Sequence, residues 1–223
     1  MTPSLLIIET SHRIGRVALA LGSTIVGERV LDESRRHARD LVPAVHALLG
    51  RQGLKVRDLA GVFVSHGPGS YTGLRVGIMS AKTLAYATGC PLLAVNTFAA
   101  IHAQVASQHP NLDVLADAQQ DKVYVQRFGS AASPLRIVPF TDWLIESRDR
   151  NRSVTGPALE IFAPRIEGVK VLPNEHWHAL PAGLLAVGWE RFARGERDDI
   201  YAVEPLYLRP TEAELKWQAS LAP

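Results

Sequence analysis

The chain has 223 residues, of which 47% are hydrophobic and 21% are charged, and its formal net charge is +2. This composition is typical of a globular protein with one large core or two smaller ones, and the small net charge argues against a dedicated nucleic-acid surface. The single cysteine, Cys90, excludes an intramolecular disulfide and a cysteine-built metal site. Residues 1–4 lack the pattern of a signal peptide and no apolar run has the length of a membrane span, so we expect a soluble cytoplasmic protein without a membrane partner.

The first half of the chain predicts a mixed sheet with helices on its faces. Its predicted elements are, in chain order, strands at residues 5–8, 17–21 and 24–26, a helix at 38–49, a strand near 59–65, a helix at about 74–87 and a strand at 92–95. Gly22-Ser23 forms the turn of a hairpin between the second and third strands. Three meandering strands followed by alternating helices and strands indicate an α/β sheet with mixed strand directions.

The second half of the chain repeats the strand and helix pattern of the first half less regularly. Its predicted elements are a helix at residues 97–107, strands at 112–116, 122–128 and 135–140, short elements, a helix at about 181–193, and a loosely held helix or tail at 211–223.

A glycine-rich loop between the predicted strand and helix near residue 70 is the most informative local feature. Gly67 and Gly69 can adopt positive φ, Pro68 stiffens the turn, and Ser70 or Thr72 can cap the helix. A helix N-terminus after such a loop offers backbone N–H groups to a phosphate, but the sequence matches neither common phosphate-binding fingerprint. A tight turn that serves only strand–helix packing stays open as the alternative.

Small residues recur every four positions along the helix that follows the loop. Gly73, Gly77, Ala81 and Ala85 form this stripe, with Ser80 beside it. Such a stripe lets another segment approach closely. It argues for tight packing, either inside the fold or against a partner protein.

Five features, in order along almost the full length of the chain, resemble the TsaB family. They are Leu6-Ile7-Ile8-Glu9-Thr10-Ser11; His37 ahead of Leu41-Val42-Pro43; Gly67-Pro68-Gly69-Ser70-Tyr71-Thr72-Gly73-Leu74-Arg75-Val76-Gly77; Asp117-Ala118 followed by Val123-Tyr124; and Pro205-Leu206-Tyr207-Leu208-Arg209. The third feature is highly specific, and the other four are persuasive only together.

The resemblance implies an actin-like (Hsp70-like) α/β fold with two ribonuclease-H-like lobes, each a mixed sheet flanked by helices. We place the first lobe, which carries the partner-binding helices, at residues 1–99, a reduced second lobe at 100–199, and a C-terminal segment and tail at 200–223. Two positions depart from the family pattern: Glu9 stands in place of the usual aspartate, and Gln119 in place of a common arginine. Both make an inherited nucleotide site less expected, so we expect no cofactor.

The resemblance further implies an accessory subunit rather than an enzyme, with no catalytic residues of its own. Members of the family pair with TsaD, which transfers threonylcarbamoyl to adenosine 37 of tRNAs that read codons beginning with A. The ATPase TsaE binds the pair. Contact with tRNA is expected to be indirect, because the basic cluster Arg35, Arg36 and Arg39 is more typical of a solvated helix end. Whether the chain forms a homodimer when alone stays open.

The predicted partner surface lies on the two helices of the first lobe. Its candidate residues are Leu41, Val45, Leu48, Gly73, Gly77, Ser80, Ala81 and Ala85. The loop residues Gly67, Pro68, Gly69, Ser70, Thr72 and Arg75 are assigned a structural role.

Two enzymatic alternatives compete with this interpretation. A metallopeptidase of the glycoprotease type needs converging ligands. The spacing of His37 and His46 puts them on different helix faces, and His102 and His109 could share a face but no carboxylate joins them. His176 and His178 fall in a predicted loop, so no metal site is expected. An actin-like ATPase would hold phosphate at the turn after the first strand, which lacks the usual glycine-rich sequence.

Overall fold

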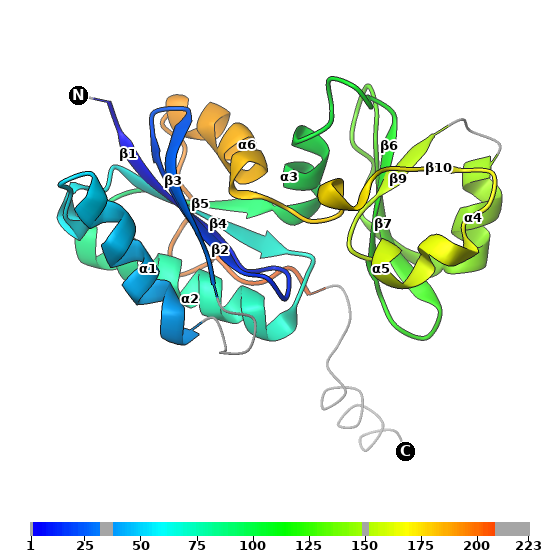
Figure 1. Ribbon diagram of the computed structural model, residues 1–223, viewed down its shortest axis with the longest axis horizontal. Helices are drawn as coiled ribbons and strands as arrows, with labels where there is room; N and C mark the ends of the chain where they lie inside the picture. The colour runs from blue at the N-terminus through cyan, green and yellow to red at the C-terminus, as the bar shows by residue number, and fades with distance from the viewer. Residues whose placement is uncertain (1, 32–37, 149–151, 208–223) are drawn as a thin grey trace, which may run out of the picture.

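The computed structural model describes residues 2–31, 38–148 and 152–207 of the chain. Two five-stranded sheets lie side by side as separate lobes, and helices cover them (Figure 1). Within the described ranges, no helix combines the length and the apolar character needed to cross a membrane.

The first sheet has the strand order β3-β2-β1-β4-β5. Its strands are β1 Ser4–Glu9, β2 Arg16–Leu21, β3 Thr24–Val30, β4 Gly61–Gly67 and β5 Leu92–Asn96. The central strand β1 pairs antiparallel with β2 and parallel with β4. Leu5 to Ile8 are fully buried, as expected for a strand covered on both faces.

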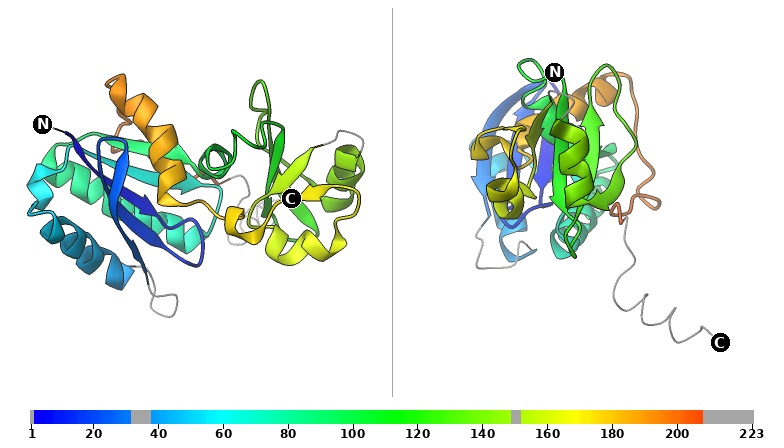
Figure 2. Two further views of the ribbon diagram at one scale, coloured as in Figure 1. Left: turned by 45° about the horizontal axis from the view of Figure 1, so that its top comes forward. Right: turned by 90° about the vertical axis from the view of Figure 1, so that its right-hand side faces the viewer.

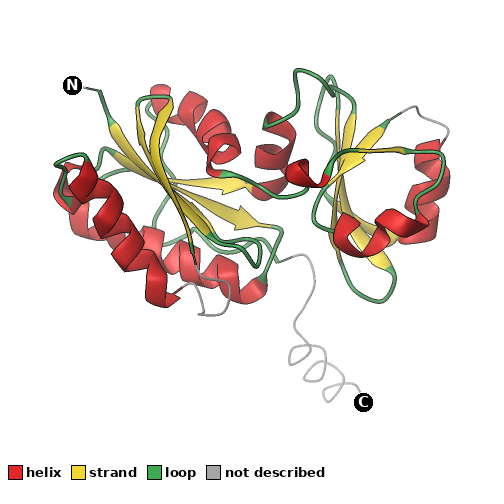
Figure 3. Ribbon diagram, viewed as in Figure 1, coloured by secondary structure: helices red, strands yellow, loops and turns green. Residues whose placement is uncertain are grey.

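Two helices cover each face of the first sheet (Figures 1 and 3). On one face lie α1 Ala38–Arg51 and α2 Tyr71–Thr88, and on the other lie α3 Thr97–Ala103 and α6 Pro181–Ala193. Alternate side chains of β1 therefore enter two different cores: Leu6 and Ile8 pack beneath α1 and α2, whereas Leu5 and Ile7 pack beneath α3 and α6.

The second sheet has the order β10-β9-β6-β7-β8. Its elements are β6 Leu112–Asp117, β7 Lys122–Phe128, β8 Arg136–Pro139, α4 Phe140–Arg148, β9 Ser153–Thr155, α5 Leu159–Phe162 and β10 Lys170–Val171. Short 3₁₀ turns lie at Ala163–Arg165 and Asn174–His176. A third 3₁₀ turn, Val56–Asp58, lies in the first lobe. Its central strand β6 pairs antiparallel with β7 and parallel with β9. This is the arrangement of the first sheet, so the predicted fold of two related lobes is confirmed.

The structure differs from the sequence division in the position of one helix. The sequence division places α6 in the second lobe, but the helix lies against the first sheet (Figure 2). Its Gly188 packs against Phe63 of β4. The segment after it stays with the first lobe as well: the N–H of Asp198 donates to the carbonyl of Leu92 (2.8 Å), and Val203 is buried in the core beneath α2. The boundaries at residues 99 and 199 themselves stay a prediction.

Most predicted elements are confirmed with small shifts at their ends, and three differ more. The strand predicted at residues 24–26 is longer, because β3 extends to Val30. The helix predicted at residues 97–107 is shorter, because α3 ends at Ala103. The strand predicted at 135–140 ends at Pro139, and Phe140 begins α4 instead. The predicted tail at 211–223 and the basic residues Arg35 and Arg36 lie outside the described residues.

Candidate functional site

The glycine-rich loop connects β4 to α2 and rests on the turn between β1 and β2. Gly67 has a φ of +115°, a conformation that a residue with a β-carbon rarely adopts. Gly69 does not adopt positive φ, which corrects the prediction; it is required because a β-carbon would collide with the carbonyl oxygen of Ser11. The N–H of Ser70 donates to the same oxygen (2.6 Å). The loop is therefore held directly against the hairpin turn.

The first turn of α2 is capped by Ser70, one of the two predicted capping residues. Its Oγ accepts the N–H of Gly73 at 3.2 Å, whereas Thr72 lies exposed within the helix. One turn further, the exposed Arg75 donates from Nε to the hydroxyl of Tyr207 (2.8 Å), and its guanidinium lies 4.0 Å from the ring centre of Tyr71. Arg75 thus links the start of α2 to the last described residue of the chain.

Glu9 ends β1 beneath this loop and is only 1% exposed. Its Oε1 accepts the N–H of Ser11 (2.6 Å), and its Oε2 has no hydrogen-bond partner among the described residues. Burial raises the pKa of Glu9 to about 7, against the opposing effect of hydrogen bonds from Ser11 and Ser65. A carboxylate that serves a phosphate-bound Mg²⁺ must be accessible and ionised, and Glu9 meets neither requirement well at neutral pH.

The small-residue stripe of α2 faces inward, which corrects its predicted place on a partner surface. A β-carbon at Gly73 would collide with the carbonyl oxygen of Thr10, and one at Gly77 with the hydroxyl of the same residue. Ala81 and Ala85 are 0% and 2% exposed. The small side chains let α2 approach the end of β1, so the close packing that the spacing predicts occurs inside the lobe.

The candidates on α1 are buried for the same reason. Leu41, Val45 and Leu48 are at most 3% exposed and pack with the stripe and the sheet in one core. Of the eight predicted interface residues, only Ser80 is partly accessible. Hydrophobic periodicity identifies the face of a helix that is buried, and here the lobe's own sheet covers that face.

Apolar side chains do remain on the outside of both helices. Val42 of α1 is 67% exposed, and Met79 and Tyr86 of α2 are 60% and 71% exposed. We call these three residues the outer apolar face. Both helices lie on the same side of the first sheet (Figure 1). The sequence signal for this face is weak, because isolated apolar residues opposite a core stripe are common on protein surfaces.

Two histidines and a glutamate meet where the lobes face each other. The Nε2 atoms of His178 and His12 lie 3.1 Å and 3.3 Å from Oε1 of Glu160. The two imidazole rings stack with their centres 3.6 Å apart. Burial lowers the pKa of His178, and the neighbouring His12 lowers it further. We call these three side chains the His–Glu–His cluster.

The sequence singled out His178 but not its two neighbours in this cluster. His12 comes from the β1–β2 turn and Glu160 from α5, so no spacing along the chain connects them. The other histidine pairs do not converge: His46 is exposed on α1, His102 stacks on Phe128, and His37 lies outside the described residues.

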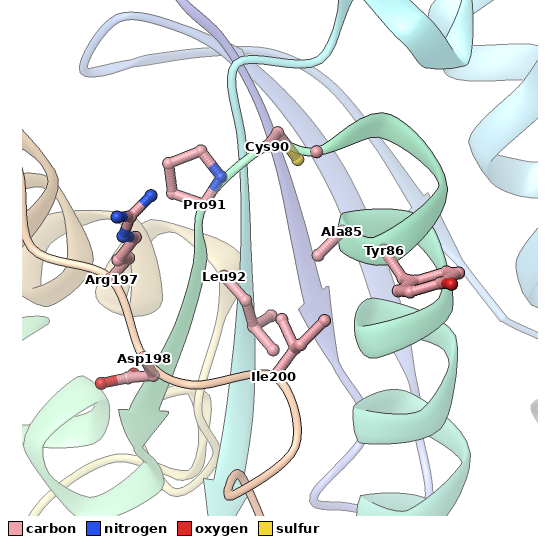
Figure 4. A pocket seen from close by; sticks show the side chains of 9 residues that line it. Ala85, Tyr86, Cys90, Pro91, Leu92, Arg197, Asp198 and Ile200 are labelled. Carbon is pink, nitrogen blue, oxygen red and sulfur yellow. The ribbon is translucent and has the colours of Figure 1, made fainter.

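A pocket of about 250 Å³ lies at the far end of α2 from the glycine-rich loop (Figure 4). It is lined by Ala85, Tyr86, Gly89, Cys90, Pro91, Leu92, Arg197, Asp198 and Ile200. The Asp198 carboxylate is already engaged, since it accepts hydrogen bonds from Arg191 and from the N–H of Ala94, both at 2.7 Å. Burial raises the pKa of Cys90, which leaves a neutral thiol of low reactivity.

Comparisons with known proteins converge on one pathway of tRNA modification. A family model described as TsaD, tRNA N6-adenosine threonylcarbamoyltransferase, matches residues 25–138. The chain is 30% identical over 227 residues to the tRNA threonylcarbamoyladenosine biosynthesis protein TsaB of Bacillus subtilis, and the alignment covers 96% of this chain and 97% of that protein.

A solved structure matches the whole fold. YeaZ from Pseudomonas aeruginosa superposes with a TM-score of 0.77 at 23% identity, and the match covers 92% of this chain and 100% of YeaZ. At this level of identity the similarity shows the fold.

Proposed function

Because the chain belongs to the TsaB family of tRNA threonylcarbamoyladenosine biosynthesis proteins, we propose that it is the non-catalytic partner and activator of TsaD. In this role TsaD transfers threonylcarbamoyl to adenosine 37 of tRNAs that read codons beginning with A. TsaE binds the pair, and tRNA contacts TsaD rather than this chain. Since the substrate is tRNA, the complex works in the cytoplasm.

The observation that carries the proposal is the outer apolar face of α1 and α2. The core beneath these helices is complete without Val42, Met79 and Tyr86, so the first lobe does not need their exposed side chains for its own packing. Aromatic residues and methionine are enriched at the centres of protein interfaces, where they provide large contact areas. A facing helix pair of TsaD would bury this face.

The buried stripe contributes to the same surface indirectly. Because Gly73 and Gly77 hold α2 tightly against β1, the helix presents Met79 and Tyr86 from a fixed position. A surface fixed in this way loses little conformational freedom when it binds. The stripe therefore supports partner binding by fixing the position of α2, and its own residues do not contact the partner.

A non-catalytic role is supported by the turn at which actin-like ATPases hold phosphate. In this chain Gly69 and Ser70 lie directly on Ser11, and Glu9 is buried beneath the same turn. The metallopeptidase and free-standing ATPase alternatives would each require turnover by the isolated chain. We expect no tRNA modification, peptide hydrolysis or ATP hydrolysis until TsaD is added.

The proposal is tested by placing a charge on the outer apolar face. Met79→Asp and Tyr86→Asp should each weaken binding to the TsaD of the same organism at least about tenfold, because a buried carboxylate without a partner is costly in an interface. Ile145→Asp on α4, where the wild-type side chain is 64% exposed, is the matched control in the second lobe. Gel filtration and calorimetric titration measure the binding, and a thermal melt confirms the fold.

Two results would contradict this assignment. Normal complex formation by folded Met79→Asp and Tyr86→Asp variants would remove the outer apolar face from the interface. Loss of binding in Ile145→Asp alone would move the partner surface to the second lobe. If the isolated chain forms a homodimer, the same two variants should also weaken it, since one apolar face would serve both contacts.

A further inference from the structure

The His–Glu–His cluster is chemically distinct from the partner surface and lies at the junction of the lobes. We propose that His12, Glu160 and His178 bind a divalent transition-metal ion, with Zn²⁺ as the best fit. The ion would tie the β1–β2 turn of the first lobe to α5 of the second. This inference is independent of the proposed pairing with TsaD.

The distances between the ligand atoms suit a tetrahedral ion. With bonds of about 2.0–2.2 Å, neighbouring ligand atoms around tetrahedral Zn²⁺ lie about 3.3–3.6 Å apart. The distances from Oε1 of Glu160 to Nε2 of His12 and His178 are 3.3 Å and 3.1 Å. Two edges of the tetrahedron are therefore already formed.

The ligand types also match. Two imidazoles and one carboxylate, with a fourth position left for water, are a common zinc-binding set. Nε2 of each histidine already lies within 3.3 Å of the same carboxylate oxygen, Oε1 of Glu160. The cationic Arg16 also faces His178, but its own charge is balanced by Glu28 at 2.7 Å.

Access and adjustment are both available at this position. The Glu160 side chain is 52% exposed, and the two histidine side chains are 19% and 24% exposed, so an ion can enter from solvent. The rings are stacked with an interplanar angle of 25°. They must fan apart for both lone pairs to reach one ion, which a partly exposed site permits.

Binding would have a structural consequence because the ligands are spread over the molecule. His12 precedes β2 in the first lobe, Glu160 belongs to α5 in the second, and His178 lies in the segment that leads back to α6. An ion held by all three would restrict opening of the lobes and would stabilise the native state by mass action.

The test uses the full chain, free of any histidine tag and dialysed against a chelator. Calorimetric titration with Zn²⁺ should show one ion per chain, and Co²⁺ should give the visible absorption of a tetrahedral site. His12→Gln, Glu160→Gln and His178→Gln should each weaken Zn²⁺ binding by more than about tenfold, since even outer-shell changes cost that much. His46→Gln, which removes an exposed imidazole on α1, is the control and should bind normally.

Thermal melts separate a metal site from a simple polar contact. Zn²⁺ should raise the melting temperature of the wild type and of His46→Gln, but not that of Glu160→Gln. Absence of stoichiometric binding in the wild type would overturn the proposal. So would equal binding by all variants. A fall in melting temperature in the three variants without any effect of Zn²⁺ would show an inter-lobe hydrogen-bonded contact only, and would overturn it as well.

Discussion

The two lobes share one strand order and differ in how they bury charge beside the central strand. In both, the strand parallel to the central one leads into a left-handed glycine: Gly67 ends β4 with a φ of +115°, and Gly156 follows β9 with a φ of +119°. In the first lobe β1 is apolar from Leu5 to Ile8 and carries Glu9 at its end. In the second, Asp113 lies near the start of β6 and is fully buried.

The surroundings of these two carboxylates are opposite. Asp113 is bound by Arg152, faces Arg127 at 3.5 Å, and accepts hydrogen bonds from Trp143 Nε1 (2.9 Å) and Ser147 Oγ (3.2 Å). No cation is paired with Glu9 among the described residues, and its pKa rises to about 7. The related lobes thus use two solutions: one buried carboxylate is paired with arginines, and the other is pushed towards its neutral form by burial.

The difference follows from the size of the lobes. The first sheet has a helix of 13 residues or more on each face, and its two cores are built from apolar side chains, one of them shared with Leu112, Val114 and Ala116 of β6. In the second, α5 has four residues and β9 has three, so fewer apolar contacts are available. The network around Asp113 connects β6, β7, α4 and the segment before β9, and it supplies part of the cohesion that apolar area supplies elsewhere.

The largest predicted effect concerns the network of the second lobe. Asp113→Ala should lower the free energy of unfolding by about 3–5 kcal/mol, because it leaves the largely buried Arg152 without a carboxylate and Arg127 with Glu146 alone. The Arg127 and Arg152 side chains are each 14% exposed. Urea unfolding measures the loss. Where the alanine variant does not fold, Asp113→Asn keeps an acceptor for Trp143 and gives a smaller loss of the same sign.

Asp121→Ala provides the matched control. Asp121 also pairs with an arginine in the second lobe, Arg165, but both side chains are about half exposed. An exposed ion pair contributes little because water screens it. Similar losses for Asp113→Ala and Asp121→Ala would show that burial does not set the value of these pairs.

The second prediction concerns the glycines of the first lobe. Gly73→Ala should lower the free energy of unfolding by about 3 kcal/mol, since its β-carbon meets the backbone of Thr10 and an overpacked core cannot relax easily. Gly50→Ala on α1 is the control, because nothing lies within 4 Å of its β-carbon. That change should be neutral or should stabilise by up to about 1 kcal/mol. An unchanged melting temperature for Gly73→Ala would mean that α2 moves away from β1 at little cost.

The two lobes differ in how far their elements can be predicted from the sequence. Long apolar runs such as Leu5 to Ile8 identify buried strands, and the spacing in residues 38–49 identifies a helix, so the first sheet follows from the sequence. The four-residue α5 and the two-residue β10 are too short to show any periodicity. The second lobe is therefore predicted only in outline.

The candidate sites were predicted less well than the fold. Spacing identified α2 as closely packed, but spacing does not say which surface it packs against, and the surface proved to be Thr10 of its own lobe. The His–Glu–His cluster combines three segments that are far apart in the chain. Only the path of the backbone brings them together.

The smallest predicted effect concerns Glu9, the buried carboxylate of the first lobe that is compared with Asp113 of the second. A carboxyl whose pKa is about 7 in the folded state and about 4.5 when unfolded binds its proton more tightly in the folded state. Its contribution to stability is therefore fully present below pH 4.5 and is lost as the pH rises to about 7. We expect the loss to be up to about 3 kcal/mol, because a difference of about 2.5 pKa units corresponds to about 3.4 kcal/mol at full effect.

Glu9→Gln removes this titration while it keeps an oxygen for the N–H of Ser11. The variant should match the wild type near pH 4.5 and become progressively more stable than the wild type up to about pH 7, with a constant difference above that. Urea unfolding of both proteins across this range measures the difference, and groups common to both cancel. A difference that stays flat from pH 4.5 to 8 would mean that Glu9 ionises normally in the folded state. Such a result would require Glu9 to be paired with a cation, as Asp113 is, and the described residues around Glu9 provide none.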